Sequence, residues 1–223
     1  LSDTNANLLK TLSEKAPGTF HHSLQVANLA ESAANEIGAN ALLVRVGALY
    51  HDIGKLDNPH YFSENQSGAV SPHDELGPQQ SAKIIIDHVK NGIRLAQKNK
   101  LPERVIDFIR THHGTSSVYY FYKKQLKIDS ETEIKSFQYP GPRPFSKETA
   151  ILMMADAVEA ASKSLKVPNI DELESFVNGI IDDKMKSLQF NDSNITLSEI
   201  ETVKKVLFKK LINVYQLRIE YPK

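Results

Sequence analysis

The chain contains no cysteine among its 223 residues, and it has no net charge, since 27 Lys and Arg residues balance 27 Asp and Glu residues. Without cysteine, disulfides and thiolate metal sites are excluded, so any transition metal must take nitrogen and oxygen ligands. The lack of cysteine also fits a reducing compartment. Proteins that bind nucleic-acid polymers usually carry a basic face, so the zero net charge argues against such a partner but allows a small anionic ligand.

Long hydrophobic runs are also missing. No apolar stretch approaches the ~20 residues that cross a bilayer, and no signal peptide is visible. The most apolar stretch, Ala150 to Ala161, is interrupted by Asp156 and Glu159. The chain begins at Leu1 rather than Met, so we expect it to be part of a longer protein. We expect residues 1–223 to form a single domain. A chain of this length can bury a substantial core without disulfide cross-links.

Helical spacing dominates what is present. After His22, apolar residues recur at 3.6-residue spacing, and Thr196 with Glu199 forms a capping box. No segment has a convincing strand pattern, so the sequence predicts an all-α fold. Helices are expected over 5–13, from 22 onward, over 41–53, 77–98, 102–112, 146–165 and 171–186, and after 196.

Two connections are long, namely 56–78 and 116–145. Both contain aromatic residues together with Gly and Pro. Loops of this length in a compact domain are usually functional or disordered. Their aromatic content favours a functional role for both.

Several His and Asp residues occupy positions that face the predicted core. Polar groups in such positions need a partner, and helical bundles build metal sites from ligands on several core-facing helices. Five His and two Asp exceed the needs of one metal, but a bridging carboxylate would let them serve two metals about 3.5–4 Å apart. Asp52 is the natural bridge, because it directly follows His51. The candidate metal ligands are His22, His51, Asp52, His88, His112, His113 and Asp156.

The adjacent pair His112 and His113 needs a special backbone. Neighbours on a helix point ~100° apart, so both reach one metal only where the helix ends, which Gly114 makes possible. At each position the alternative is an ordinary hydrogen-bonded core histidine. Of the remaining histidines, His21 is expected next to the ligands or in solvent. His60 and His73 are expected to be surface residues of a loop, where either could touch substrate.

Five segments carry a family resemblance. Residues 22–31, 51–55, 112–115, 139–142 and 155–160 resemble, in this order, the cytosolic HD domain of seven-transmembrane HD proteins, a branch of the HD-domain metal phosphohydrolases. The resemblance covers nearly the whole chain. It implies an HD-domain helical bundle with a two-metal centre, and a parent protein anchored in the cell membrane with this domain on the cytoplasmic side.

The resemblance also implies roles for individual residues. One metal would take His22, His51, Asp52 and Asp156, and the other would take Asp52, His88, His112 and His113. Fe or Mn is the implied metal, and Lys55 would contact the phosphate. Related HD-GYP enzymes carry Gly-Tyr-Pro soon after the paired histidines, whereas this chain has Gly-Thr-Ser at 114–116, which argues against cyclic-di-GMP as the substrate.

The implied reaction is hydrolysis of the cyclic dinucleotide c-di-AMP to linear 5′-pApA. A metal-bridging hydroxide would attack phosphorus in line, with Asp52 and Lys55 as the catalytic residues. The two long loops would read the adenine bases. Their candidate contact residues are Tyr61, Phe62, Asn65, Tyr119, Tyr122 and Arg143.

Three other functions fit the same ligands. They are an HD hydrolase of another nucleotide, an HD-type di-iron oxygenase, and a sensor that binds a nucleotide without cleaving it. The complete ligand set argues against the sensor, because a degenerate domain would be free to lose ligands. The sequence leaves the oligomeric state open.

Overall fold

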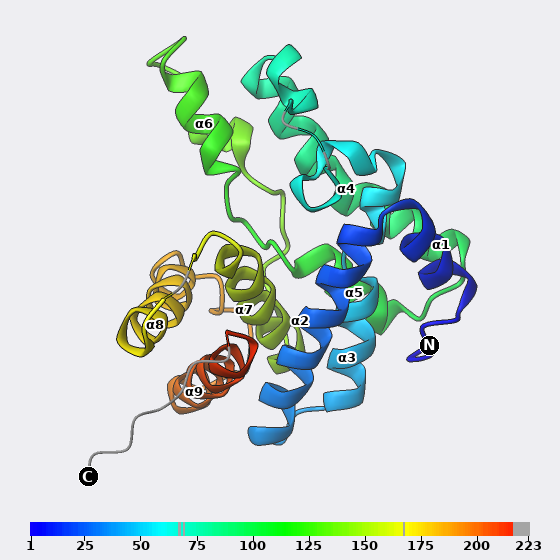
Figure 1. Ribbon diagram of the computed structural model, residues 1–223, viewed down its shortest axis with the longest axis vertical. Helices are drawn as coiled ribbons and strands as arrows, with labels where there is room; N and C mark the ends of the chain where they lie inside the picture. Colours follow the sequence, from blue (N-terminus) through cyan, green and yellow to red (C-terminus); the bar gives the residue numbers. More distant parts are fainter. Residues whose placement is uncertain (67, 69, 167, 216–223) are drawn as a thin grey trace.

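The computed structural model describes residues 1–66, 68, 70–166 and 168–215, and these residues are mainly helical (Figure 1). Apart from an isolated antiparallel bridge between Ser117 and Gln138, the described residues contain no extended strand pairing. The all-α prediction is therefore confirmed. The α-helices are α1 Asn7–Lys15, α2 Pro17–Glu36, α3 Ala41–Tyr50, α4 Pro78–Lys98, α5 Glu103–Thr111, α6 Tyr119–Leu126, α7 Lys147–Ser162, α8 Ile170–Lys186 and α9 Leu197–Val214. Short 3₁₀ helices are η1 Ile53–Asp57, η2 Pro59–Tyr61, η3 Ser63–Asn65, η4 Pro72–Glu75 and η5 Ile134–Phe137.

Helix α2 lies at the centre of the bundle, where it packs against α3, α7 and α9 (Figure 1). The stripe predicted from its spacing is buried, including Val26, Leu29, Ala30 and Ala33. Small alanine side chains let neighbouring helices approach closely, and the 3.6-residue period keeps them on one face. The main core cluster draws residues from α1 to α5 and from α7 to α9.

Two predicted helix boundaries near the site are wrong. Helix α2 begins at Pro17, which suits the first helical position, so His22 lies in its second turn rather than opening the helix. Helix α3 ends at Tyr50 rather than Ile53. The backbone of Asp52, with φ −107° and ψ 12°, leaves the helical region and leads into η1. His51 and Asp52 therefore sit at a break between two helical segments.

A close backbone contact fastens this break to α4. A Cβ atom on Gly54 would lie 1.8 Å from the His88 carbonyl oxygen and 2.4 Å from the Gly92 amide nitrogen. Only glycine allows two backbones to approach so closely. The contact holds Asp52 and His88, which come from separate elements, beside each other.

The two long connections contain more regular structure than their sequences predicted. The first holds the end of η1 and the 3₁₀ helices η2 to η4, and the second holds α6 and η5. Helix α6 buries Phe121 and Gln125, which are four residues apart and so share a face. Phe121 packs with Ala82 and Phe137 in a second, smaller core cluster. The aromatic run was therefore a helix with a buried face rather than an irregular loop.

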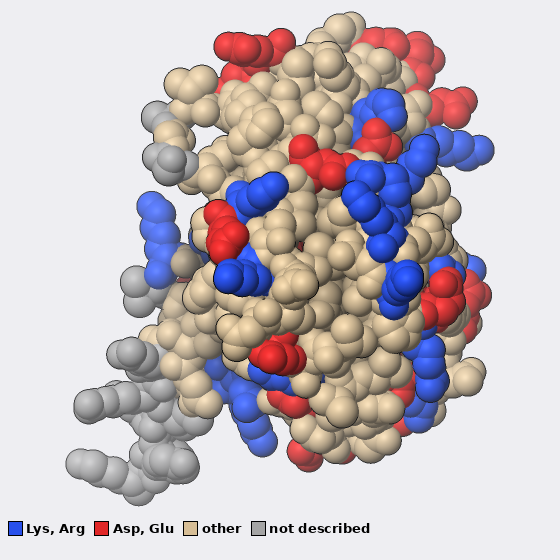
Figure 2. Space-filling view, turned by 90° about the vertical axis from the view of Figure 1, so that its right-hand side faces the viewer, with Lys and Arg blue, Asp and Glu red and all other residues tan. Residues whose placement is uncertain are grey.

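Charges of both signs are interspersed over the face of the molecule in Figure 2. None of the helices in the described part of the chain combines the length and the apolar character that crossing a bilayer requires.

Candidate metal centre

Five segments of the chain bring their His and Asp side chains to one place. His22 comes from α2, His88 from α4 and Asp156 from α7, while His51 with Asp52 and His112 with His113 follow the ends of α3 and α5. All of these residues are buried except His113, which is partly buried. Three groups have ligand atoms within 4.8 Å of one another: His22, His51 and Asp156; His51, Asp52 and His112; and His88, His112 and His113.

The carboxylate of Asp52 divides this cluster into two halves. Its Oδ2 atom lies 3.6 Å from His22 Nε2 and 3.4 Å from His51 Nε2. Its Oδ1 atom lies 3.2 Å from His88 Nε2 and 3.6 Å from His112 Nε2. One oxygen thus faces each half, which is the arrangement that a bridging ligand needs.

Each half has further close contacts. In the first half, Asp156 Oδ1 lies 3.0 Å from His22 Nε2 and 3.6 Å from His51 Nε2. In the second half, the Nε2 atoms of His88 and His112 are 3.1 Å apart. Two imidazole lone pairs at that distance repel each other, so a shared proton or a cation between them is favourable.

The orientation of three histidines follows from helix geometry. His51, His88 and His112 each direct Nδ1 at the backbone carbonyl three residues earlier, at 2.6 Å for His51 and 2.8 Å for His112. A carbonyl oxygen only accepts hydrogen bonds, so each Nδ1 carries a proton and Nε2 is the nitrogen available to a metal once it is deprotonated. Such bonds orient metal-binding histidines and fix their tautomer.

His22 is oriented by a carboxylate instead. Its Nδ1 atom hydrogen-bonds to Glu159 Oε2, and Lys163 Nζ lies 3.1 Å from the same oxygen. A carboxylate that accepts the Nδ1 proton of a metal-binding histidine makes that imidazole a more basic ligand. Sequence reasoning gave Glu159 no role, although its spacing of three residues from Asp156 in an apolar helix was a usable signal.

Electrostatics differ between the two halves. Burial opposes ionisation of Asp52, but Lys55 and His51 outweigh it and hold the pKa of this carboxyl well below its usual range. Burial likewise disfavours a proton on His51, yet Asp52 and Asp156 raise its pKa to about 10. In the other half, burial and the neighbouring His112 hold the pKa of His113 well below its usual value.

The cluster meets the requirements of a divalent-metal site. His51 Nε2 and Asp52 Oδ1 are buried and have no hydrogen-bond partner among the described residues. Unpartnered buried polar atoms are rare and call for an explanation, which a bound cation supplies. Imidazole nitrogen and carboxylate oxygen together suit divalent Fe, Mn, Co, Ni or Zn.

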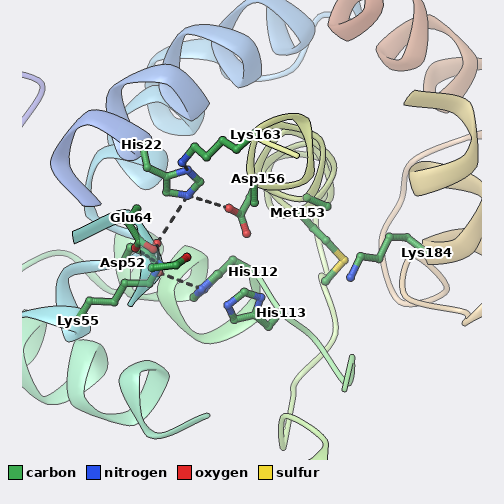
Figure 3. Close-up of a pocket in the computed structure, with 13 residues that line it drawn as sticks. His22, Asp52, Lys55, Glu64, His112, His113, Met153, Asp156, Lys163 and Lys184 are labelled. Carbon is green, nitrogen blue, oxygen red and sulfur yellow. Dashed lines mark hydrogen bonds and ion pairs between the residues drawn. The ribbon is translucent and has the colours of Figure 1, made fainter. Parts of the chain in front are cut away.

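A cavity of about 480 Å³ opens onto the cluster (Figure 3). His22, Asp52 and Asp156 line it, and so do two residues that sequence reasoning missed, Glu64 and Lys184. No sequence signal marked either one, because both occupy ordinary polar positions.

Lys55 lies at the edge of this cavity as a partly buried ion-pair partner rather than a solvated side chain. Its Nζ atom is 2.8 Å from Asp52 Oδ2 and 2.6 Å from Glu64 Oε1. Thr19 donates a further hydrogen bond to Glu64 Oε1 at 3.0 Å. The segment around η3 is therefore tied to both α2 and the metal cluster.

The end of α5 places His113. Gly114 has φ +52°, which favours glycine, and a Cβ there would lie 2.3 Å from Gln189 Oε1. The helix ends at Thr111 with His112 as its C-cap, so Gly114 lies one residue beyond the C′ position predicted for it. His113 stacks on Tyr139 with ring centroids 4.2 Å apart and an interplanar angle of 25°. Sequence reasoning gave Tyr139, which comes from the Tyr-Pro-Gly-Pro turn, no role in the site.

Two of the predicted base contacts lie beside the metal cavity. Tyr61 and Phe62 line a second cavity of about 310 Å³, which shares Ser63 and Glu64 with the first. The Phe62 ring packs edge-on to His88 at 5.7 Å between centroids. This second cavity is thus an aromatic extension next to the metal cluster.

The other predicted base contacts lie away from the cavity or are held by other residues. Asn65 accepts a hydrogen bond from the Thr19 amide at 3.0 Å and donates one to its hydroxyl at 2.8 Å. Tyr119 is 55% exposed on α6. Tyr122 packs against Phe137, and Arg143 binds the Asp192 carboxylate at 2.8 Å.

One expectation for the remaining histidines is wrong. His73 is buried instead of exposed, because the first long connection folds back and packs its ring against Tyr61 and Phe121. Its Nε2 atom donates to the Tyr61 carbonyl at 2.9 Å. His21 and His60 are exposed, as expected.

Comparison with known proteins agrees with this architecture. The chain is 46% identical over 223 residues to the cyclic-di-AMP phosphodiesterase PgpH of Bacillus subtilis (strain 168). It is 44% identical over 222 residues to the PgpH of Listeria monocytogenes serotype 1/2a (strain 10403S). Each match covers 100% of this chain but only 31% of the relative, so the chain spans less than a third of the length of these proteins.

A solved structure matches over almost the whole chain. It is the crystal structure of the L. monocytogenes phosphodiesterase PgpH HD domain in complex with cyclic-di-AMP. The identity is 44% and the TM-score 0.91, with 96% of this chain and 99% of that chain covered. The HD-domain model matches residues 19–161, which include all seven candidate metal ligands. The predicted helical HD bundle is confirmed, and the chain belongs to the HD domain family.

Proposed function

We propose that this domain is a metal-dependent phosphodiesterase that hydrolyses one phosphodiester of c-di-AMP to give linear 5′-pApA. The observation that carries the proposal is the position of Asp52, whose two oxygens face separate histidine groups at the wall of an open cavity. Two-metal sites of this kind are common in phosphoesterases. The activity named for the two PgpH relatives and the cyclic-di-AMP bound to the related HD domain support this substrate.

The proposed ligand sets follow the two halves of the cluster, and Fe or Mn is the proposed metal. The first set is His22, His51, Asp52 and Asp156, and the second is Asp52, His88, His112 and His113. When bound, divalent cations supply Lewis acidity, which lowers the pKa of water from 15.7 towards roughly 7 and neutralises charge on a phosphoryl group.

Lys55 and Glu64 act on the phosphate side of the cavity. Although burial disfavours its charge, Asp52 and Glu64 hold the pKa of Lys55 above its ordinary value, so it remains a cation. Lys55 therefore offers a fixed positive charge to the phosphoryl oxygens as negative charge develops in the transition state. Glu64 is a positioning residue, because it holds the ammonium group at 2.6 Å beside Asp52.

Base recognition is proposed for the aromatic extension of the cavity. Tyr61 and Phe62 line it, and their rings offer surfaces on which an adenine base can stack. The existing contacts of Asn65 and Arg143 suit them to shaping the loops rather than touching a base. Tyr119 and Tyr122 do not line this extension, although Tyr120 and Phe121 of the same helix α6 do.

Chromatographic analysis of products tests reaction class and base preference together. The Mn- or Fe-loaded chain is incubated with c-di-AMP, with c-di-GMP and with mononucleotides, and we expect 5′-pApA from c-di-AMP as the main product. Asp129→Asn, a variant of an exposed carboxylate, is the matched control for variants of the metal ligands such as Asp52→Ala. Cleavage of mononucleotides alone would support another HD hydrolase. Oxygen consumption without ester cleavage would support an oxygenase, and unchanged nucleotide would support a sensor.

We also propose that residues 1–223 act as one domain of a longer membrane-anchored protein, on the cytoplasmic side of the membrane. The 31% share of the PgpH relatives that the chain spans supports the longer parent protein, and the family resemblance supports the membrane anchor and its side. Proteolysis of the intact parent protein in sealed and opened membrane vesicles would test the placement. The proposed partner is a small cyclic dinucleotide rather than a nucleic-acid polymer.

A further inference from the structure

The described residues that line the metal cavity include three lysines, and their surroundings differ. Lys55 is bound by Asp52 and Glu64, and Lys163 lies 3.1 Å from Glu159. Both cations thus already have carboxylate partners. Lys184 forms no ion pair in the part of the chain that the structure describes, although it lines the same cavity.

Lys184 is held in place by a hydroxyl group. It comes from the last turn of α8, is partly buried, and donates a hydrogen bond to Ser116 Oγ at 2.8 Å. Ser116 is itself fixed, since its amide donates to the His113 carbonyl at 3.0 Å and its carbonyl accepts from the Tyr139 amide at 2.9 Å. The ammonium group is therefore held through Ser116 at a set position relative to the metal cluster.

The position of Lys184 separates it from the other cavity cations. In Figure 3 it enters beside Met153, on the side of the cavity away from Lys55 and Asp52. Burial lowers the pKa of Lys184, while Asp156 and Asp183 raise it only partly towards its ordinary value. A partly buried ammonium group without a paired carboxylate is a favourable binding point for an incoming anion.

We propose that Lys184, with Ser116 beside it, binds the second, non-scissile phosphate of the cyclic dinucleotide. This inference rests on the proposed function, because a cyclic dinucleotide presents a second phosphodiester to the far wall. One phosphodiester would lie at the metal cluster beside Lys55, and the ring would carry the other towards Lys184. The residue would thereby favour cyclic dinucleotides over substrates with a single phosphodiester.

The test compares two substrates on the full Mn-loaded chain. One is c-di-AMP, and the other is bis(p-nitrophenyl) phosphate, which has one phosphodiester and no second phosphate. We expect Lys184→Met to raise KM for c-di-AMP by about 10- to 100-fold with kcat little changed, as expected when a charge-assisted hydrogen bond is lost from ground and transition states alike. Its kcat/KM for bis(p-nitrophenyl) phosphate, its metal content and its Tm should match the wild type.

Three further variants provide a control and separate the role of the charge from that of the hydroxyl group. Lys186→Met, an exposed lysine two residues along α8, is the matched control and should behave as wild type. Lys184→Arg keeps the charge and should recover part of the affinity for c-di-AMP. Ser116→Ala, which removes the hydroxyl but not the cation, should raise KM for c-di-AMP less than Lys184→Met does.

Three outcomes would contradict the inference, and each has a different consequence for the proposed function. Equal losses on both substrates would overturn the inference and assign Lys184 to the scissile phosphate or to the fold. Unchanged c-di-AMP kinetics in Lys184→Met would overturn the inference and leave the proposed function intact. A wild-type chain that cleaves bis(p-nitrophenyl) phosphate but not c-di-AMP would overturn the proposed substrate and the role of Lys184 with it.

Discussion

Replacing Gly54 by alanine tests how the backbone contact between η1 and α4 builds the metal centre. The added Cβ would lie 1.8 Å from the His88 carbonyl oxygen, whereas ordinary contacts begin at 3.4 Å. The two segments must therefore separate by about 1.5 Å in Gly54→Ala, since backbone atoms on both sides leave no flexible side chain to yield. Gly54 has no left-handed φ, so backbone strain does not contribute.

A separation of this size removes one half of the metal cluster. His88 Nε2 lies 3.2 Å from Asp52 Oδ1, and bonds between metals and such ligands tolerate changes of only about 0.2 Å. We expect the half that contains His88 to lose its metal, while the half that contains His22 and Asp156 keeps one. Overpacking typically costs about 1–3 kcal/mol, and contact between two backbones favours the upper part of that range.

Elemental analysis of metal content and urea unfolding of the metal-free protein measure these two effects separately. Gly179→Ala is the matched control, because Gly179 lies in α8 with nothing within 4 Å of the added Cβ. It should raise the free energy of unfolding by about 0.5–1 kcal/mol and leave metal content unchanged. A Gly54→Ala protein with full metal content and wild-type stability would refute the close-packing argument.

Three further predictions concern the ligands. Asp52→Ala should remove both metals and activity while largely sparing the fold by circular dichroism, and full metal occupancy in this variant would refute the bridging role. Glu159→Gln should weaken metal binding at His22 by about 10- to 100-fold, measured by metal titration, whereas an unchanged affinity would show that the carboxylate does not tune this imidazole. Asp52 and Asp156 raise the pKa of His51 to about 10 despite its burial, so a proton must leave before metal binds and metal affinity should rise with pH. Activity at limiting metal should therefore fall as the pH is lowered from about 8 to 5, and a flat rate profile over that range would contradict this reasoning.

The local pattern of the chain determined most of the helices. Apolar spacing located the central helix, and the predicted capping box at Thr196 and Glu199 is present at the start of α9. These features could be read because helix periodicity and capping depend on residues three or four apart. Local pattern was less reliable for the aromatic run at 119–122, where burial against Phe137 favoured a helix over a loop.

The metal ligands could also be anticipated from sequence, because a buried His or Asp in an apolar segment requires a partner. Spacing alone did not show which oxygen of Asp52 would face which histidine. That arrangement depends on the break after α3 and on the contact of Gly54 with α4. Both features involve backbone conformation and long-range packing.

Other parts of the site were decided by tertiary structure alone. Glu64 reaches Lys55 only because its segment is tied to Thr19, and Lys184 reaches the cavity only because α8 packs on α7. Such residues are ordinary polar side chains within their own segments, so no local pattern distinguishes them. The sequence by itself therefore determined the helices and the kinds of metal ligand. Tertiary structure decided the division of the cluster into two halves and the cations around it, because those depend on contacts between residues far apart in the chain.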